Sequence, residues 1–200
     1  MINTSSQAIK QYDLSHTDNI FLDCGAYSMK ATPINYPFER YFAWIETFRD
    51  HNLKYVATVD FIGKVEDTVF GLIECIDHDN SIPWIPVLQG NTINDYCLNA
   101  QLYKDYGIST DTIAIGNLKT KSVFEIMTIL DFFKSSKIHA FGLRIDQFSR
   151  PNIWHNIDST DSGTWKSRPK TTAQKYKQLA QFKSRLKDLT CNYSNQTTLT

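Results

Sequence analysis

The sequence predicts an α/β protein of the (β/α) TIM-barrel type, and three observations lead to this prediction. Short apolar runs rich in Val, Ile and aromatic residues recur along the chain, and each ends in a polar residue or Gly. Segments with helical hydrophobic periodicity lie between them, and such alternation is typical of a parallel sheet. The polar ends of the first five runs are about 26 to 37 residues apart, close to the length of about 30 residues of one βαβ unit.

Six apolar runs have the length of buried parallel strands. They span residues 19–25, 54–63, 83–90, 112–118, 137–144 and 156–161. A barrel of this type has eight strands and usually about 250 residues, with about 200 as the lower limit. We therefore expect a barrel that is reduced or incomplete, and an open doubly wound sheet is the structural alternative.

Five segments show the periodicity of amphipathic helices. They span residues 36–52, 65–80, 92–107, 121–136 and 171–188. In the first of them, Phe38, Phe42 and Ile45 recur at helical spacing. The fifth, which follows the last strand, gives a basic C-terminal helix and tail over residues 166–200.

The composition indicates a globular protein. The chain has 200 residues, of which 42% are hydrophobic, and its formal net charge is zero, so we expect a single domain with a sizeable core. No apolar run reaches the roughly 18 residues of a transmembrane helix. Residues 1–18 form a polar lead-in without the apolar core of a signal peptide, and we therefore expect a cytoplasmic protein with no membrane partner.

The four cysteines do not have the spacing of a metal site. Cys24, Cys75, Cys97 and Cys191 include no CxxC pair, and no His lies at a zinc-site spacing from them. We expect reduced thiols, no metal and no cofactor.

A set of polar residues and Gly at the ends of the strands predicts a functional site. Asp23, Asp60, Gln89, Gly116 and Asp158 close five of the runs, and a barrel gathers the carboxyl ends of its strands at one mouth. One Asp after a strand is more often a turn or helix-capping residue, so the prediction depends on the set. Two carboxylates can act as nucleophile and as acid/base at a sugar carbon, and a Gly lets the backbone approach a ligand.

Four stretches of the chain carry a resemblance to a known family. "FLDCGAYS", "PVLQG", "IAIGNL", and "HAFGL" followed by "NIDSTDSGTW", resemble motifs of the tRNA-guanine transglycosylases. The chain is most similar to the shorter branch found in phages and bacterial DNA-modification clusters, which inserts deazapurines into DNA. The resemblance covers about residues 19–165.

The resemblance implies the catalytic pair. Asp158 matches the nucleophile that attacks C1′ of the sugar, and Asp23 matches the general acid/base. Asp161 is a rival for the nucleophile because "DSTD" offers two Asp residues three positions apart. We favour Asp158, because Ile157 continues the strand pattern directly into it.

The resemblance also implies a base-binding set. Its members are Tyr27, Cys24, Asp60, Gln89, Gly116 and Gly142. Asp60 and Gln89 are expected to read the purine edge, and Tyr27 replaces the Phe that stacks on the base. Stacking of a base on an aromatic ring is worth about 1–3 kcal/mol. Cys24 stands where the tRNA enzymes have Ser.

The implied reaction is base exchange in DNA. Guanine leaves its sugar, and a queuosine-related 7-deazaguanine of the preQ0 type takes its place without a redox cofactor or ATP. The tRNA branch carries a zinc site of three Cys and one His after the nucleophile. Here Cys191 is the one cysteine after Asp158, which is too few for that zinc site. DNA is therefore expected as the partner rather than tRNA.

A basic segment is expected to contact nucleic acid. Residues 166–187 hold eight Lys or Arg and no Asp or Glu, which suits a surface that contacts phosphates. Trp165, Lys166, Arg168 and Lys170 are the expected contacts. A solvated amphipathic helix, with its apolar side packed inward, accounts for the same pattern.

Three alternatives to DNA base exchange stay open at this point. They are an RNA enzyme of the tRNA-guanine transglycosylase type, a glycosidase-like N-glycosyl hydrolase on the same barrel, and a non-catalytic nucleic-acid-binding relic. A second copy of the chain or a helper protein is an open partner in each of them.

Overall fold

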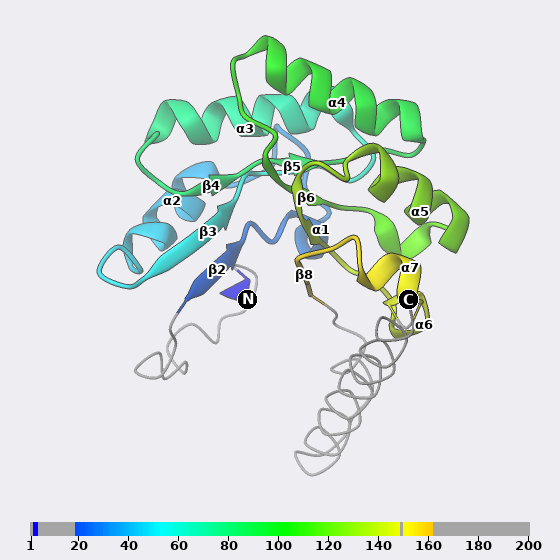
Figure 1. The fold of residues 1–200 in the computed structure, drawn as a ribbon. Helices are drawn as coiled ribbons and strands as arrows, with labels where there is room; N and C mark the ends of the chain where they lie inside the picture. The colour runs from blue at the N-terminus through cyan, green and yellow to red at the C-terminus, as the bar shows by residue number, and fades with distance from the viewer. Residues whose placement is uncertain (1, 4–18, 149, 162–200) are drawn as a thin grey trace.

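The computed structural model describes residues 2–3, 19–148 and 150–161, and it shows an α/β fold with parallel strands (Figure 1). The strands are β1 (Ile2–Asn3), β2 (Ile20–Asp23), β3 (Leu53–Ala57), β4 (Trp84–Ile85), β5 (Val87–Leu88), β6 (Thr112–Ile115), β7 (Lys137–Ala140) and β8 (Ser159–Thr160). The helices are α1 (Ala26–Met29), α2 (Phe38–Glu46), α3 (Val65–His78), α4 (Ile93–Asp105), α5 (Val123–Phe132), α6 (Ile145–Phe148) and α7 (Pro151–Trp154), with a 3-10 turn η2 (Leu118–Thr120).

The strands form two four-stranded sheets in chain order, β1-β2-β3-β4 and β5-β6-β7-β8, and every pairing is parallel. Only Pro86 separates β4 from β5 in the sequence, so the two sheets follow one another along one continuous segment. Pro has no backbone N–H to donate to a ladder, which suits a break at this position.

The predicted elements are largely confirmed. Each of the six predicted strand runs overlaps a strand, and the run at 83–90 is divided into β4 and β5. Helices α2 to α5 lie within the first four predicted helical segments. The fifth segment, 171–188, lies outside the described residues, as do Trp165, Lys166, Arg168 and Lys170. Within the polar lead-in of residues 1–18, the structure describes only Ile2 and Asn3, which form β1 beside β2 with Ile2 opposite Leu22.

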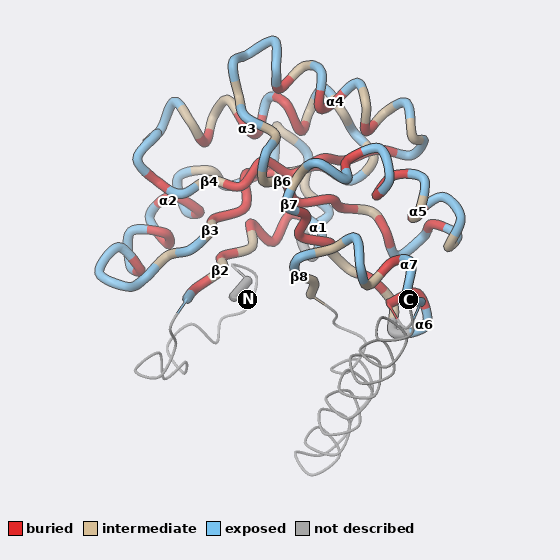
Figure 2. Tube along the Cα trace, viewed as in Figure 1, coloured by how far each residue is buried: buried red, intermediate tan, exposed pale blue. Residues whose placement is uncertain are grey.

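Helices α2 to α5 lie in an arc along the outer side of the strands (Figure 1). One outer core joins the second sheet to α3, α4 and α5, with Leu88, Ile115 and Ile138 from the strands. A second outer core joins β2 and β3 to α2, with Leu22 and Val56 from the strands. Figure 2 shows buried residues following the strands and the strand-facing sides of these helices.

The opposite face of the strands carries a separate inner cluster. It contains Ala57, Ile85, Val87, Ala114, Phe21, Tyr55 and Phe141. The two sheets curl toward one another on this face, because the rings of Phe21 in β2 and His139 in β7 are stacked with centroids 4.4 Å apart. Phe21 and His139 belong to different sheets, so their contact brings distant strands together around a common interior.

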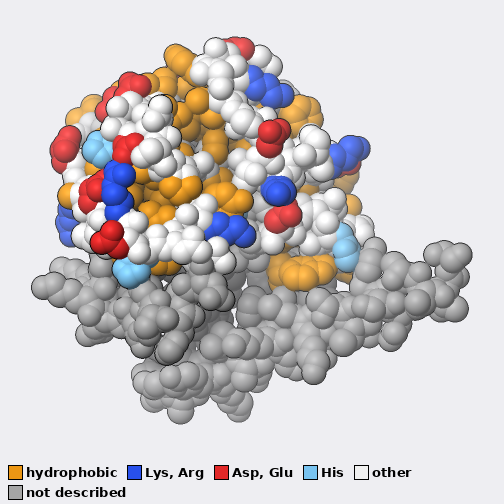
Figure 3. Space-filling view, turned by 60° about the vertical axis from the view of Figure 1, so that its left-hand side comes forward, with side chains coloured by type: hydrophobic (Ala, Val, Ile, Leu, Met, Phe, Trp, Pro, Cys, Tyr) orange, Lys and Arg blue, Asp and Glu red, His pale blue; other side chains and the backbone are white. Residues whose placement is uncertain are grey.

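One outer face of the molecule is shown by Figure 3, which turns the α2 and α3 side of Figure 1 forward. Hydrophobic side chains gather across its middle, with charged side chains around them. Phe38 of α2 and Phe70 of α3 meet edge-on with ring centroids 6.1 Å apart. Within the described part of the chain, no helix combines the length and apolar character that a membrane crossing would require.

Candidate active site at the carboxyl ends of the strands

Strand alternation decides which side chains face the interior. Val87, Ala114, His139 and Ser159 lie in one row across β5 to β8 by register. Successive side chains point to opposite faces of a strand, so the next inward row toward the carboxyl ends holds the residues two positions later. These residues are Gln89, Gly116, Phe141 and Asp161.

The same rule places Asp23 on the interior side. Phe21 of β2 is stacked on His139, and His139 Nδ1 lies 2.8 Å from Ser159 Oγ. These two contacts connect β2, β7 and β8 in one layer. Asp23 follows Phe21 by two residues and Asp161 follows Ser159 by two, so both aspartates belong to the layer above, at the carboxyl ends.

Backbone amides hold both carboxylates. The Gly142 N–H donates to Asp161 Oδ1 at 2.7 Å, and the Gly25 N–H donates to Asp23 Oδ1 at 3.3 Å. Both glycines have positive φ, 70° and 76°, a region that other residues enter at a cost. The loop after β2 thus directs an N–H at its own Asp23, and the loop after β7 directs one at Asp161, which follows the neighbouring strand β8.

Asp158, the favoured nucleophile, does not belong to this set. It precedes β8, and its N–H donates to the carbonyl of Ile138 at 2.9 Å. Its Oδ2 accepts from the Ile138 N–H at 2.7 Å, near the amino end of β7. The expectation that Asp158 closes the last strand was wrong, because β8 begins after Asp158 instead of running into it. Asp158 thus lies at the amino ends of the strands, whereas Asp161 lies at their carboxyl ends.

Asp60, Cys24 and Gln89 form one hydrogen-bonded group. The Cys24 thiol donates to Asp60 Oδ1 at 3.0 Å, and the Gln89 Nε2 amide donates to Asp60 Oδ2. Burial raises the pKa of Asp60, and the two hydrogen bonds counteract part of that rise. Burial, followed by the charges of Asp60 and Asp23, raises the pKa of the Cys24 thiol well above its usual value. Cys24 is therefore a neutral donor, as the Ser of the resembling family would be.

Gly116 fits against the amide of Gln89. A Cβ added to Gly116 would lie 2.1 Å from Gln89 Nε2, which excludes any larger side chain without a shift of that amide. The Gln89 N–H donates to Asn99 Oδ1 at 2.9 Å, which fixes the backbone of the same residue. Gln89 Oε1 is buried and has no hydrogen-bond partner among the described residues. Gln89 Oε1 is thus an acceptor to which a ligand can donate a hydrogen bond.

Tyr27 differs from the other expected base-binding residues in its exposure. It lies in α1, four residues after Asp23, and its side chain is 66% exposed. An exposed aromatic ring is open to stacking with a flat ligand.

The loops around the site are tied to one another. Asn91 Nδ2 donates to the Gly63 carbonyl at 3.1 Å, which joins the loops after β5 and β3. Asn117 Nδ2 donates to the Gly90 carbonyl at 3.0 Å, and Gln147 Nε2 donates to the Lys121 carbonyl at 2.8 Å. Loops from β3 to β7 are therefore linked in series, which favours a preformed site.

Ser159 lies beneath the site, where its hydroxyl pairs with His139, and no motif in the sequence singles it out. Alternation along the strand is the sequence signal that puts Asp161 on the same face as Ser159 and Asp158 on the opposite face. This signal depends on where the strand begins, and β8 begins only at Ser159.

No metal site is formed by the described residues, since no three His, Cys, Asp or Glu side chains among them are grouped as a bound ion would require. Cys24 and Cys75 are buried, Cys97 is partly exposed, and none of these three cysteines forms a disulfide with another described residue. No protein-family model and no curated protein sequence matches this chain.

Proposed function

We propose that the protein is a base-exchange transglycosylase that replaces guanine in DNA with a 7-deazaguanine of the preQ0 type. The proposal retains the reaction that the resemblance implies and assigns the covalent step to Asp161. The fold it requires is a (β/α) barrel, reduced or incomplete, with the site at the carboxyl ends of its strands. The observation that carries the proposal is the layer formed by Phe21, His139 and Ser159, because it aligns Asp23 and Asp161 across one interior.

The reaction divides into two displacements at C1′ of the sugar. In the first, an oxygen of Asp161 forms a bond to C1′ while the C1′–N9 bond of guanine breaks. Asp23 gives a proton to the leaving base. In the second, the ring N–H of the deazaguanine loses its proton to Asp23, its nitrogen bonds C1′, and the ester to Asp161 breaks. Two displacements retain the anomeric configuration.

The residues proposed to bind the base have the chemical groups that a purine-like ligand requires. Asp60 and Gln89 offer carboxylate and amide atoms beside each other, and Tyr27 offers an exposed ring. The target base has to leave the duplex stack to reach such a site, as in other enzymes that act on bases. DNA is preferred to tRNA on the sequence resemblance.

The decisive test compares two asparagine variants three residues apart. Asp161→Asn is expected to lower guanine exchange into DNA by at least about 10³-fold, because the covalent step loses its nucleophile. Asp158→Asn is the matched control and should retain activity close to that of the wild type. The measurement is incorporation of labelled guanine or preQ0 into DNA, with nucleoside mass spectrometry of the product.

A second readout detects the intermediate directly. Protein mixed with DNA and denatured should show a covalent protein–DNA adduct that disappears in Asp161→Asn and persists in Asp158→Asn. Release of free guanine without incorporation would instead indicate an N-glycosyl hydrolase, and binding without either product would indicate a non-catalytic protein. An adduct lost only in Asp158→Asn would overturn the assignment of Asp161.

A further inference from the structure

His139 is a polar residue inside an aromatic cluster. Its ring is stacked on Phe21 with centroids 4.4 Å apart and meets Phe141 edge-on at 4.6 Å. The side chain is only 6% exposed. A phenyl ring in this position would make similar ring contacts without removing a polar atom from water. Packing therefore does not explain why an imidazole stands here.

The two imidazole nitrogens have different surroundings. Nδ1 lies 2.8 Å from Oγ of Ser159, the residue opposite His139 in the β7–β8 register. Nε2 is buried and has no hydrogen-bond partner among the described residues. Buried polar side-chain atoms have a partner in the large majority of cases, so an orphaned Nε2 points to a ligand atom at this position.

The position of His139 relates this nitrogen to the candidate site. His139 belongs to the inner row directly below Asp161, and its ring covers Phe21, which lies directly below Asp23. Its register partner on β6 is Ala114, whose side chain is a single methyl group. A ligand atom beside the ring therefore meets no larger side chain from β6.

We propose that His139 is a further substrate-contacting residue, which hydrogen-bonds through Nε2 to the nucleobase held between Asp23 and Asp161. Ser159 fixes the ring through Nδ1, so that Nε2 remains available to the ligand. The inference rests on the proposed base exchange and extends it by a polar contact at the floor of the site. Burial lowers the pKa of His139 to about 4, so the imidazole is neutral at pH 7 and suits an uncharged heterocycle.

Two amide variants separate the roles of the two nitrogens. The His139→Gln variant can place an amide where Nε2 lies, whereas His139→Asn can reach only the position of Nδ1. We expect His139→Gln to keep the KM for the free base within about threefold. His139→Asn and His139→Phe should each raise it about tenfold, equivalent to about 1.4 kcal/mol. Thermal unfolding of each variant shows whether it is folded. If His139→Phe exchanges base with the wild-type KM, or if only His139→Asn does so, the inference is overturned.

A measurement on the wild-type protein does not depend on turnover. In protein labelled with ¹⁵N-histidine, addition of guanine or preQ0 should shift the Nε2 resonance of His139 more than its Nδ1 resonance, with His139→Phe providing the assignment. A shift without exchange activity would sink the proposed reaction and retain the contact. Exchange activity without a shift would contradict the His139 contact and retain the proposed reaction. If neither a shift nor exchange activity is observed, both proposals are overturned.

Discussion

Asp158 and Asp161, three residues apart, show how position along a strand decides the face to which a side chain points. An odd number of positions along a strand reverses the face to which a side chain points. Ser159 faces the interior through His139, so Asp161 shares that face and Asp158 does not. Asp158 instead accepts the Ile138 N–H, a role in the local structure of β7 and β8.

His139 also predicts an acid sensitivity of the folded protein. Its pKa is lowered from 6.5 to about 4 by burial, so the folded state binds a proton less readily than the unfolded chain. The stability contributed by the neutral imidazole is complete above pH 6.5 and is lost as the pH falls from 6.5 toward 4. One such group lowers the free energy of unfolding by about 2 kcal/mol between pH 7 and pH 5.

The measurement is urea unfolding of the wild type and of His139→Phe at several pH values from 7 to 5. The variant should show a smaller loss of stability over this range, and the difference between the two proteins isolates His139 from the carboxylates. Equal pH slopes in both proteins would contradict a depressed pKa at this residue.

At the scale of elements, the helices that pack on the outer faces of the strands hold the strands, and therefore the site residues, in place. The inner rows reach the site because the outer faces of the strands are covered by α2 to α5. Helices α4 and α5 begin with capping boxes, formed by Thr92 with Asp95 and by Ser122 with Glu125. These boxes fix the residues at which the loops after β5 and β6 end and the helices begin. Such caps typically contribute about 1 kcal/mol each.

Gly71 tests how closely α3 approaches the strands. Replacement of Gly by Ala in a helix interior usually stabilises by up to about 1 kcal/mol. Here a Cβ would lie 2.2 Å from the backbone carbonyl oxygen of Val59, two residues after β3, and a backbone atom cannot move aside as a flexible side chain can. We expect Gly71→Ala to destabilise the protein by about 1–3 kcal/mol, measured by urea unfolding.

Gly107→Ala is the control for this prediction. Nothing lies within 4 Å of a Cβ at Gly107, but its φ of +74° is unfavourable for Ala. The expected cost is about 1 kcal/mol from the backbone alone. A stabilised Gly71→Ala protein would show that α3 does not pack as closely as described.

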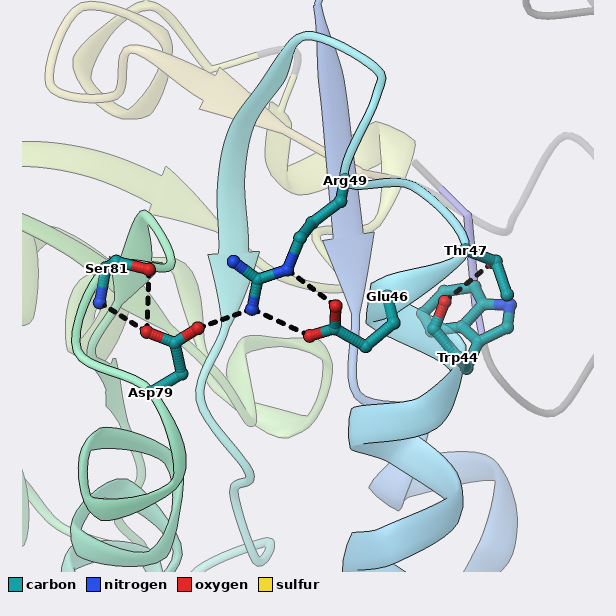
Figure 4. Close-up of polar contacts among 6 residues, drawn as sticks. All are labelled: Trp44, Glu46, Thr47, Arg49, Asp79 and Ser81. Atoms are coloured by element: carbon teal, nitrogen blue, oxygen red, sulfur yellow. Dashed lines mark hydrogen bonds and ion pairs between the residues drawn. The ribbon is translucent and has the colours of Figure 1, made fainter.

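At the scale of the whole molecule, a few polar contacts at the surface join segments whose positions are set mainly by the hydrophobic cores. Arg49, after α2, contacts Glu46 and Asp79, and Asp79 also accepts from the N–H and the hydroxyl of Ser81 (Figure 4). Hydrogen bonds from Ser81 and Arg49 lower the pKa of Asp79. The group connects α2 to the loop after α3 at the molecular surface.

We expect Arg49→Ala to have little effect on stability. Exposed ion pairs are screened by water and salt, so the melting temperature should fall by no more than about 3 °C. Lys134→Ala, which removes an exposed pair with Asp131 inside one segment, provides the comparison. A fall in melting temperature that exceeds this limit and persists in 1 M NaCl would show that the group holds the fold together.

Much of the fold could be predicted from the sequence. Apolar runs and helical periodicity located the strand regions and α2 to α5, because burial of one face imposes a local repeat on the chain. The parallel α/β class followed from the alternation of these elements. β1 could not be predicted in this way, since two residues are too short to carry a pattern.

The candidate site was predictable only in part. The sequence by itself determined that Asp23, Asp60, Gln89 and Gly116 lie at or after the carboxyl ends of strands, because those strands are recognisable from local composition. Only the tertiary structure decided that Asp161 belongs with them and that Asp158 does not. Two observations were needed for this decision: the register of β7 with β8 and the contact of Phe21 with His139. Both involve residues far apart in the chain, and a local sequence pattern does not show which distant residues will be in contact.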